Sequence, residues 1–251
     1  MQLRTIDATR YVMPLREGGS LPALVEASDD GLYVVKLRGA GQGPKALVAE
    51  LVAGELARAL GFTVPELTFV ELDPALARAE PDPEIQDLLA ASAGVNLGVD
   101  FLPGALPFSP VAGPVPAPDL AAAIVWFDAL VTNVDRTARN TNMLEWHERV
   151  WLIDHGAALY FHHAEQAPGF ESARFPQIAE HVLLPFASSI AAADERLAPL
   201  VTDALLEELA AAIPDVWLAG DNSEIYADYL RARLRAPRGF VEEADEARDR
   251  Q

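Results

Sequence analysis

At 251 residues, with 51% hydrophobic and 23% charged residues, the chain has the composition of a folded globular protein and not of a disordered one. A formal net charge of −19 repels nucleic-acid backbones and anionic lipid, so we expect neither as a partner. The chain has no uninterrupted apolar run of about 18 residues, so we expect no membrane span. The absence of cysteine excludes disulfides and thiolate chemistry. The amino terminus lacks the apolar core of a signal peptide, so we expect a cytoplasmic location.

The first hundred residues are predicted to be rich in strands, with one long helix. Alternating β-favouring residues and glycine turns predict an antiparallel meander that begins near residue 9. The helix is expected over residues 44–60, with Pro44 at its start and Gly61 just past its end. A shorter helix is expected over residues 81–91. The strands are expected over residues 9–15, 23–27, 32–37, 65–72 and 95–101.

A proline-rich segment over residues 103–118 predicts a connection, and the pattern beyond it is mostly helical. Residues 119–132 are apolar nearly all round and predict a buried helix. Two short strands are expected over residues 143–146 and 150–153. The charged last dozen residues are expected to fray. The remaining helices are expected over residues 172–183, 188–197, 199–212 and 222–235.

Two clusters of acidic and amide residues follow the helix at 119–132. Asn140 lies five positions after Asp135, and the apolar strand at 150–153 runs directly into Asp154. Phosphoryl transfer from a metal-nucleotide uses such a set: one carboxylate orients the attacking hydroxyl, while an asparagine and a second carboxylate hold magnesium. Such residues also cap and turn loops without any further role. A carboxylate that ends a buried strand, however, needs a partner such as a cation, so the two clusters together favour a catalytic site.

Lys36 is one of only two lysines in the chain, the other being Lys45. It ends a predicted strand ahead of the long helix, which carries Glu50 and Glu55. A buried ammonium needs an acidic partner, and Glu50, nearer the helix start, is the preferred one. A surface lysine on an edge strand is the alternative. The helix glutamates favour a lysine that contacts phosphate.

Glycine-rich segments and histidines carry weaker signals. The turn Gly18-Gly19-Ser20 offers backbone N–H groups to phosphate oxygens, as does the loop at 39–43. Glycine turns in hairpins also exist for their backbone angles alone. Neither segment is a Walker motif. The spacing of His155, His162 and His163 matches no usual zinc site, so we expect them not to be ligands.

These residues resemble the HipA-like kinases, in particular the short bacterial HipA-related proteins that consist of little more than a kinase core. The resemblance implies an α+β, bilobal protein-kinase-like fold of the type shared by protein kinases and phosphoinositide kinases. Residues 1–102 would form a strand-rich N-lobe with one long helix, 103–118 a connection, and 119–251 a mostly helical C-lobe. It rests on residues 33–36, 49–61 with Val64-Pro65, 133–140 and 152–156.

The resemblance also implies cofactors and roles. ATP and Mg²⁺ would be bound, with Asp135 as the catalytic base and Asn140 and Asp154 as metal ligands. Lys36 would contact the α- and β-phosphates, and Glu50 would be its ion-pair partner.

Further roles follow for the adenine site and the reaction. The hinge that holds adenine would be Asp100-Phe101-Leu102. Thr137 stands where many members of the family carry a histidine, so proton handling differs there. The predicted reaction is transfer of phosphate to a hydroxyl, with a protein Ser or Thr favoured over a small molecule on family grounds. Two alternatives remain open: a nucleotide-binding pseudokinase that acts by interaction, and a kinase-fold enzyme that transfers AMP.

Overall fold

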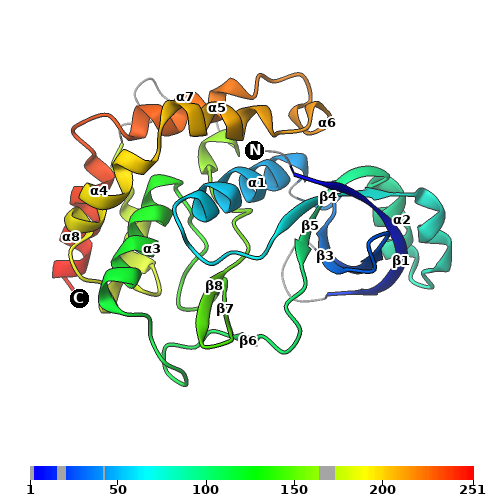
Figure 1. Ribbon diagram of the computed structural model, residues 1–251, viewed down its shortest axis with the longest axis horizontal. Coiled ribbons are helices and arrows are strands. Elements are labelled where there is room, and N and C mark those ends of the chain that lie inside the picture. Colours follow the sequence, from blue (N-terminus) through cyan, green and yellow to red (C-terminus); the bar gives the residue numbers. More distant parts are fainter. Residues whose placement is uncertain (1–2, 16–20, 42, 164–172) are drawn as a thin grey trace.

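A computed structural model describes residues 3–15, 21–41, 43–163 and 173–251 of the chain. A β-barrel lies at one end and a group of helices at the other, with a long helix, α1 (Gly43–Ala59), between them (Figure 1). This arrangement confirms an α+β architecture. The order of strands first and helices later agrees with the change of pattern across residues 103–118.

Five strands form a closed barrel in the order β1-β2-β3-β5-β4. Neighbouring strands are antiparallel, except that β1 and β4 pair in parallel and so close the barrel. The antiparallel meander expected from the sequence is confirmed for β1, β2 and β3. The parallel pairing of β1 with β4 was not predicted: it joins the two edges of the sheet and so removes exposed strand edges, which strand periodicity alone does not reveal. The strands are β1 (Thr5–Pro14), β2 (Ala23–Ala27), β3 (Leu32–Lys36), β4 (Leu67–Leu72) and β5 (Gly94–Asp100).

The alternation of side chains along β3 separates two hydrophobic cores. Tyr33 and Val35 are buried inside the barrel, in a core shared with β1, β2 and β4. Val34 points to the opposite face and packs against the larger core that contains α1. Because successive strand residues alternate between faces, Lys36 lies on the same face as Val34. The strand pattern thus directs this lysine toward α1.

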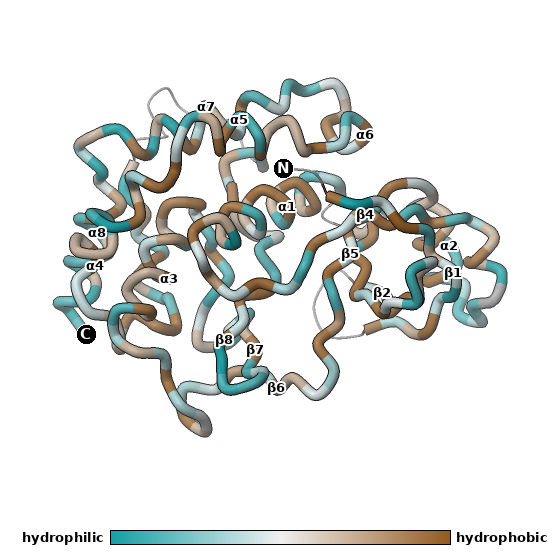
Figure 2. The backbone as a smooth tube through the Cα atoms, in the orientation of Figure 1, coloured by the Kyte–Doolittle hydropathy of each residue, from teal (hydrophilic) through white to brown (hydrophobic). Residues whose placement is uncertain are grey.

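Helix α1 is an interior helix. All its residues from Leu47 to Ala57 are buried, and Figure 2 shows hydrophobic stretches along it. It contacts β4 and β5 of the barrel and also α5 (Asp203–Ala211) and α6 (Asp215–Leu218). On α6, the indole Nε1 of Trp217 donates a hydrogen bond to the carbonyl of Val95 on β5, 3.0 Å away. One face of the barrel strands therefore shares the larger of the two cores with the helices.

The second part of the chain contains a small sheet and most of the helices. The buried helix expected from the sequence is α3 (Pro118–Leu130), and the expected hairpin is β7 (Met143–Trp146) with β8 (Arg149–Leu152). A two-residue strand, β6 (Leu106–Pro107), joins β7. The other helices of this part are α4 (Ile190–Leu197), α7 (Glu224–Arg233) and α8 (Gly239–Asp249), whereas α2 (Pro83–Ala91) lies in the first part of the chain.

Two expectations for the second part of the chain were wrong. The described part of residues 172–183 contains a 3₁₀ turn, Pro176–Glu180, in place of a long helix. It ends because His181 is extended and forms a β-bridge with Thr137. The last residues do not fray but form α8, whose Phe240, Val241 and Ala244 are buried. Its charged residues share the outer face and mask this apolar stripe.

Within the described residues, no helix is long and apolar enough to span a membrane.

Candidate active site

Lys36 joins two acidic residues that lie far apart in the sequence. Its Nζ is 2.6 Å from Oε2 of Glu50 on α1 and 2.5 Å from Oδ1 of Asp154, which is 118 residues further along the chain. The Lys36 side chain is 13% exposed and that of Glu50 is 2% exposed. The alternative of a surface lysine is therefore wrong. Glu55 instead pairs with Arg58 on α1 itself.

The charges of this ion pair are strongly stabilised. Burial opposes the charge on Lys36, but Glu50 and Asp154 outweigh it and raise the pKa of the lysine to about 12. Burial would likewise raise the pKa of Glu50, but the adjacent ammonium of Lys36 lowers it to about 2. Both groups are therefore ionised at neutral pH.

Asp154 is the exposed member of this cluster. Its side chain is 48% exposed, and within the described residues its Oδ2 has no hydrogen-bond partner. Its backbone φ of +57° is in the left-handed region, which is unfavourable for a residue with a side chain and is found preferentially at functional sites. A cavity of about 30 Å³, room for one water molecule, lies beside Lys36 and Asp154 at the first turn of α1.

Asp135 lies in the loop after α3, where three asparagines fix it. Asn133 accepts a hydrogen bond from the Asp135 backbone N–H through its side-chain oxygen, at 3.1 Å. The side-chain amides of Asn140 and Asn142 donate to Oδ2 of Asp135 at 2.8 and 3.2 Å. The loop-capping alternative thus describes Asn133 correctly, whereas Asn140 and Asn142 bond to the carboxylate itself and orient it.

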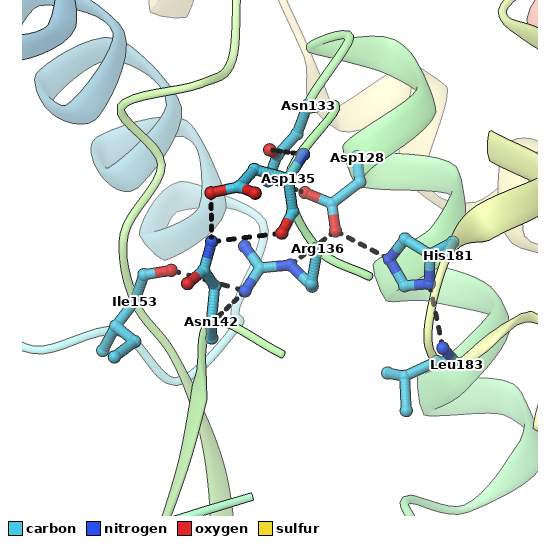
Figure 3. A network of polar contacts seen from close by, with 8 residues as sticks. All are labelled: Asp128, Asn133, Asp135, Arg136, Asn142, Ile153, His181 and Leu183. Atoms are coloured by element: carbon cyan, nitrogen blue, oxygen red, sulfur yellow. Dashed lines mark hydrogen bonds and ion pairs between the residues drawn. The ribbon is translucent and has the colours of Figure 1, made fainter. Parts of the chain in front are cut away.

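A buried network of hydrogen bonds around Asp128 holds this loop against α3 (Figure 3). Asp128 accepts hydrogen bonds from Nδ2 of Asn133 at 2.9 Å and from Nε of Arg136 at 2.6 Å. The side chains of Asp128 and Arg136 are both fully buried. Burial opposes the negative charge, but Arg136 and His181 outweigh this and hold the pKa of Asp128 well below its usual range. Asp128 was not among the residues predicted from the sequence, although an isolated acid inside an apolar helix is a usable signal.

His181 completes the network through both of its ring nitrogens. The backbone N–H of Leu183 donates to its Nδ1 at 3.0 Å, so the ring proton lies on Nε2 and is donated to Asp128, 2.9 Å away. His181 also pairs through its backbone with Thr137, the position at which many members of the resembled family carry a histidine. Its ring, however, is committed to Asp128 and does not contact Asp135.

Arg136 links the Asp135 loop to the segment that carries Asp154. Its Nη1 donates to the carbonyl of Asn142 and, at 3.4 Å, to that of Ile153. The backbone N–H of Ile153 in turn donates to the carbonyl of Asn142 at 3.1 Å. The two acidic clusters are thus hydrogen-bonded side by side (Figure 3).

The side-chain oxygens available at the site are suitable ligands for a hard divalent cation. Asn140 uses its amide nitrogen on Asp135, which leaves its oxygen available within the described residues, and Asp154 offers Oδ2. Mg²⁺ and Mn²⁺ prefer such oxygen ligands, and Mg²⁺ is usually held by one or two protein groups together with substrate phosphates. No group of three or more His, Asp or Glu side chains able to hold a metal occurs in the described residues. The described residues therefore contain no site in which His, Asp and Glu side chains alone would hold a metal ion.

The predicted hinge lies where β5 leaves the barrel. The backbone N–H groups of Asp100 and Phe101 donate to the carbonyls of Glu66 and Leu32. The N–H of Leu102 donates to none of the described residues. Burial, assisted by the negative charge of Glu66, raises the pKa of Asp100. The other predicted cofactor-binding segment, Gly18, Gly19 and Ser20, lies outside the described residues.

Comparisons with known proteins identify the fold and the family of the chain. The fold is similar to that of a Helicobacter pylori proinflammatory kinase, CtkA, with a TM-score of 0.60 and 14% identity over 98% of this chain and 99% of that one. It is also similar to a Golgi casein kinase crystallised with Mn/ADP, with a TM-score of 0.50 and 12% identity over 98% of this chain and 73% of that one. At such identities these likenesses show the fold alone. Curated protein sequences give no match. A sequence profile of the HipA-like kinases matches residues 9–237, and the chain therefore belongs to the HipA-like kinase family.

Proposed function

We propose that this protein transfers the γ-phosphate of ATP, with Mg²⁺ as the metal, to a hydroxyl group of an acceptor. The observation that carries this proposal is the contact of Lys36 with both Glu50 and Asp154. A lysine held by a helix glutamate and placed beside a metal-binding aspartate is the arrangement that kinases use to bind and neutralise phosphates.

Each side chain has a role in this mechanism. Lys36 contacts the α- and β-phosphates, and Glu50 holds its ammonium in place. Asp154 and Asn140 would hold the cation, which neutralises charge on the phosphates when bound. Asp135 accepts a hydrogen bond from the acceptor hydroxyl and orients it for in-line attack. Because the amides of Asn140 and Asn142 already fix its carboxylate, little reorganisation is required.

The nucleotide would lie between two lobes. We assign residues 1–102 to the N-lobe, 103–118 to the connection and 119–251 to the C-lobe. The adenine would be held by Asp100, Phe101 and Leu102, with the N–H of Leu102 as the donor. Gly18, Gly19 and Ser20 would cover the phosphates.

For the acceptor we propose a serine or threonine of a protein, on family grounds. Such a substrate must approach an acidic surface, given the net charge of −19, so a basic segment is favoured over an acidic one.

Labelled nucleotide tests the proposal directly. The protein is incubated with α-labelled and γ-labelled ATP in separate reactions, with Mg²⁺ and a mixture of basic Ser/Thr peptides. Label transferred only from the γ position supports the proposal. Transfer only from the α position would replace it by AMP transfer, and nucleotide binding without transfer would identify a pseudokinase.

A variant of the proposed base sharpens the same assay. Asp135→Ala is expected to abolish transfer while nucleotide affinity stays within about threefold, because Asp135 orients the acceptor and not the nucleotide. The matched control is Asp119→Asn, an exposed carboxylate at the start of α3 that contacts Ser188 and not the site. Activity that survives in Asp135→Ala would remove Asp135 from the mechanism.

A further inference from the structure

His155 is a buried polar residue that the mechanism above does not use. It follows Asp154 directly, and its side chain is 1% exposed. Neither ring nitrogen has a hydrogen-bond partner in the described part of the chain. A buried donor or acceptor left unpaired lowers the stability of the fold. An apolar residue would avoid this cost, so the imidazole at this position needs an explanation.

The ring lies between Glu50 and an aromatic side chain. Its Nδ1 is 3.7 Å from Oε1 of Glu50, the carboxylate oxygen opposite to the one that bonds to Lys36. On the other side, Phe127 of α3 packs edge-on against the imidazole, with ring centroids 6.0 Å apart. Lys36 and His155 thus address different oxygens of one carboxylate.

Helix α1 is closely packed near this ring. Gly54 lies one turn after Glu50, and a Cβ added there would be 3.9 Å from Nδ1 of His155 and only 2.8 Å from Cδ1 of Leu67. A glycine inside a helix is less favourable than alanine. The close approach to Leu67 disfavours a side chain at position 54, and the glycine keeps this turn of α1 next to the ring of His155.

We propose that His155 is a positioning residue that fixes the carboxylate of Glu50 and, through it, the ammonium of Lys36. The proposal rests on the phosphotransfer function proposed above. The terminal torsion of a glutamate has a broad energy minimum, so one bond to Lys36 does not hold the carboxylate plane. A donor on the second oxygen does hold it. The distance of 3.7 Å must shorten by less than 1 Å to make a hydrogen bond, as catalytic contacts do when substrate binds.

The contact itself is tested without any activity measurement. Melting temperatures are compared for wild type, His155→Phe, Glu50→Gln and the double variant. If Nδ1–H of His155 interacts with Glu50, the two single shifts do not add up in the double variant. Additive shifts would overturn the proposal.

Kinetics then test the consequence for Lys36. We expect His155→Phe to lower kcat/KM for ATP about tenfold, which corresponds to about 1.4 kcal/mol, and His155→Asn, which keeps a donor, to recover part of this loss. In a Glu50→Gln background, His155→Phe has no further effect. The control is His162→Phe, a buried histidine whose ring contacts Tyr226 and not Glu50; it keeps wild-type kinetics.

The two proposals fail in different ways. If wild type transfers no phosphate, the proposed function fails, and the melting-temperature cycle still decides the role of His155. If wild type is active and His155→Phe slows it equally with Glu50 or Gln at position 50, the positioning role is wrong while the function stands.

Discussion

Replacing Asp128 with asparagine is expected to destabilise the protein strongly. Asp128 is the negative partner of Arg136, and both side chains are fully buried. It also accepts hydrogen bonds from Asn133 and His181. Asp128→Asn keeps the shape but leaves the guanidinium without a counter-charge in a site that water does not reach.

The magnitude follows from this burial. Removing one member of a buried ion pair costs about 3–5 kcal/mol, because the remaining charge is uncompensated. In a chain of this size about 1 kcal/mol shifts the melting temperature by roughly 2–4 °C, so we expect a decrease of about 6–20 °C. Transfer activity should fall further than the folded fraction does, because Arg136 also bonds to the carbonyls of Asn142 and Ile153.

Thermal unfolding followed by circular dichroism measures the effect. Glu26→Gln is the control, since its ion pair with Arg10 is exposed to water and contributes little to stability. The double variant Asp128→Leu/Arg136→Met removes both charges and should recover part of the stability but none of the activity. A decrease under 2 °C in Asp128→Asn would show that Arg136 does not depend on this carboxylate.

Three further expectations address the rest of the site and the core. Asp154→Asn should leave the melting temperature within about 3 °C of wild type, because the Asp154 side chain is 48% exposed. It should nevertheless raise the Mg²⁺ concentration needed for half-maximal transfer, which a metal titration measures. Glu50→Gln should reduce the free energy of unfolding by about 3 kcal/mol, since the Glu50 pKa is lowered from 4.5 to about 2. The lowered pKa means that this advantage of wild type is complete above about pH 4.5 and shrinks as the pH falls toward 2; urea unfolding at pH 3.5 and 7 checks the sign, and an equal difference at both would contradict it. Trp217→Ala should cost about 3–5 kcal/mol and Trp217→Phe about 1, the difference being ring packing on Phe69; equal melting temperatures for the two would refute this.

Local signals in the sequence were sufficient for most elements of the barrel part and for the lysine–glutamate pair. Strand alternation and the position of Glu50 near the start of α1 both reflect short-range geometry. Asp154 was found because a carboxylate after an apolar strand is unusual. Each of these features could be predicted from residues only a few positions away in the sequence.

Other features depend on contacts between distant segments. The parallel pairing of β1 with β4 joins residues about 64 positions apart and has no local signature. Asp128 meets His181 across 53 positions, and the segment before His181 is bent out of a helix by its bridge to Thr137. For α8, charges on the outer face concealed a stripe that includes Phe240 and Ala244.

The burial of α1 has a consequence for how the molecule unfolds. Although residues 103–118 divide the sequence into two patterns, α1 contributes its apolar side chains to the core of the helical part, and Trp217 reaches back to β5. Neither half can separate without exposing this helix to water. The protein should therefore melt in a single cooperative transition. Proteolytic cleavage within the proline-rich segment should yield two fragments that remain associated.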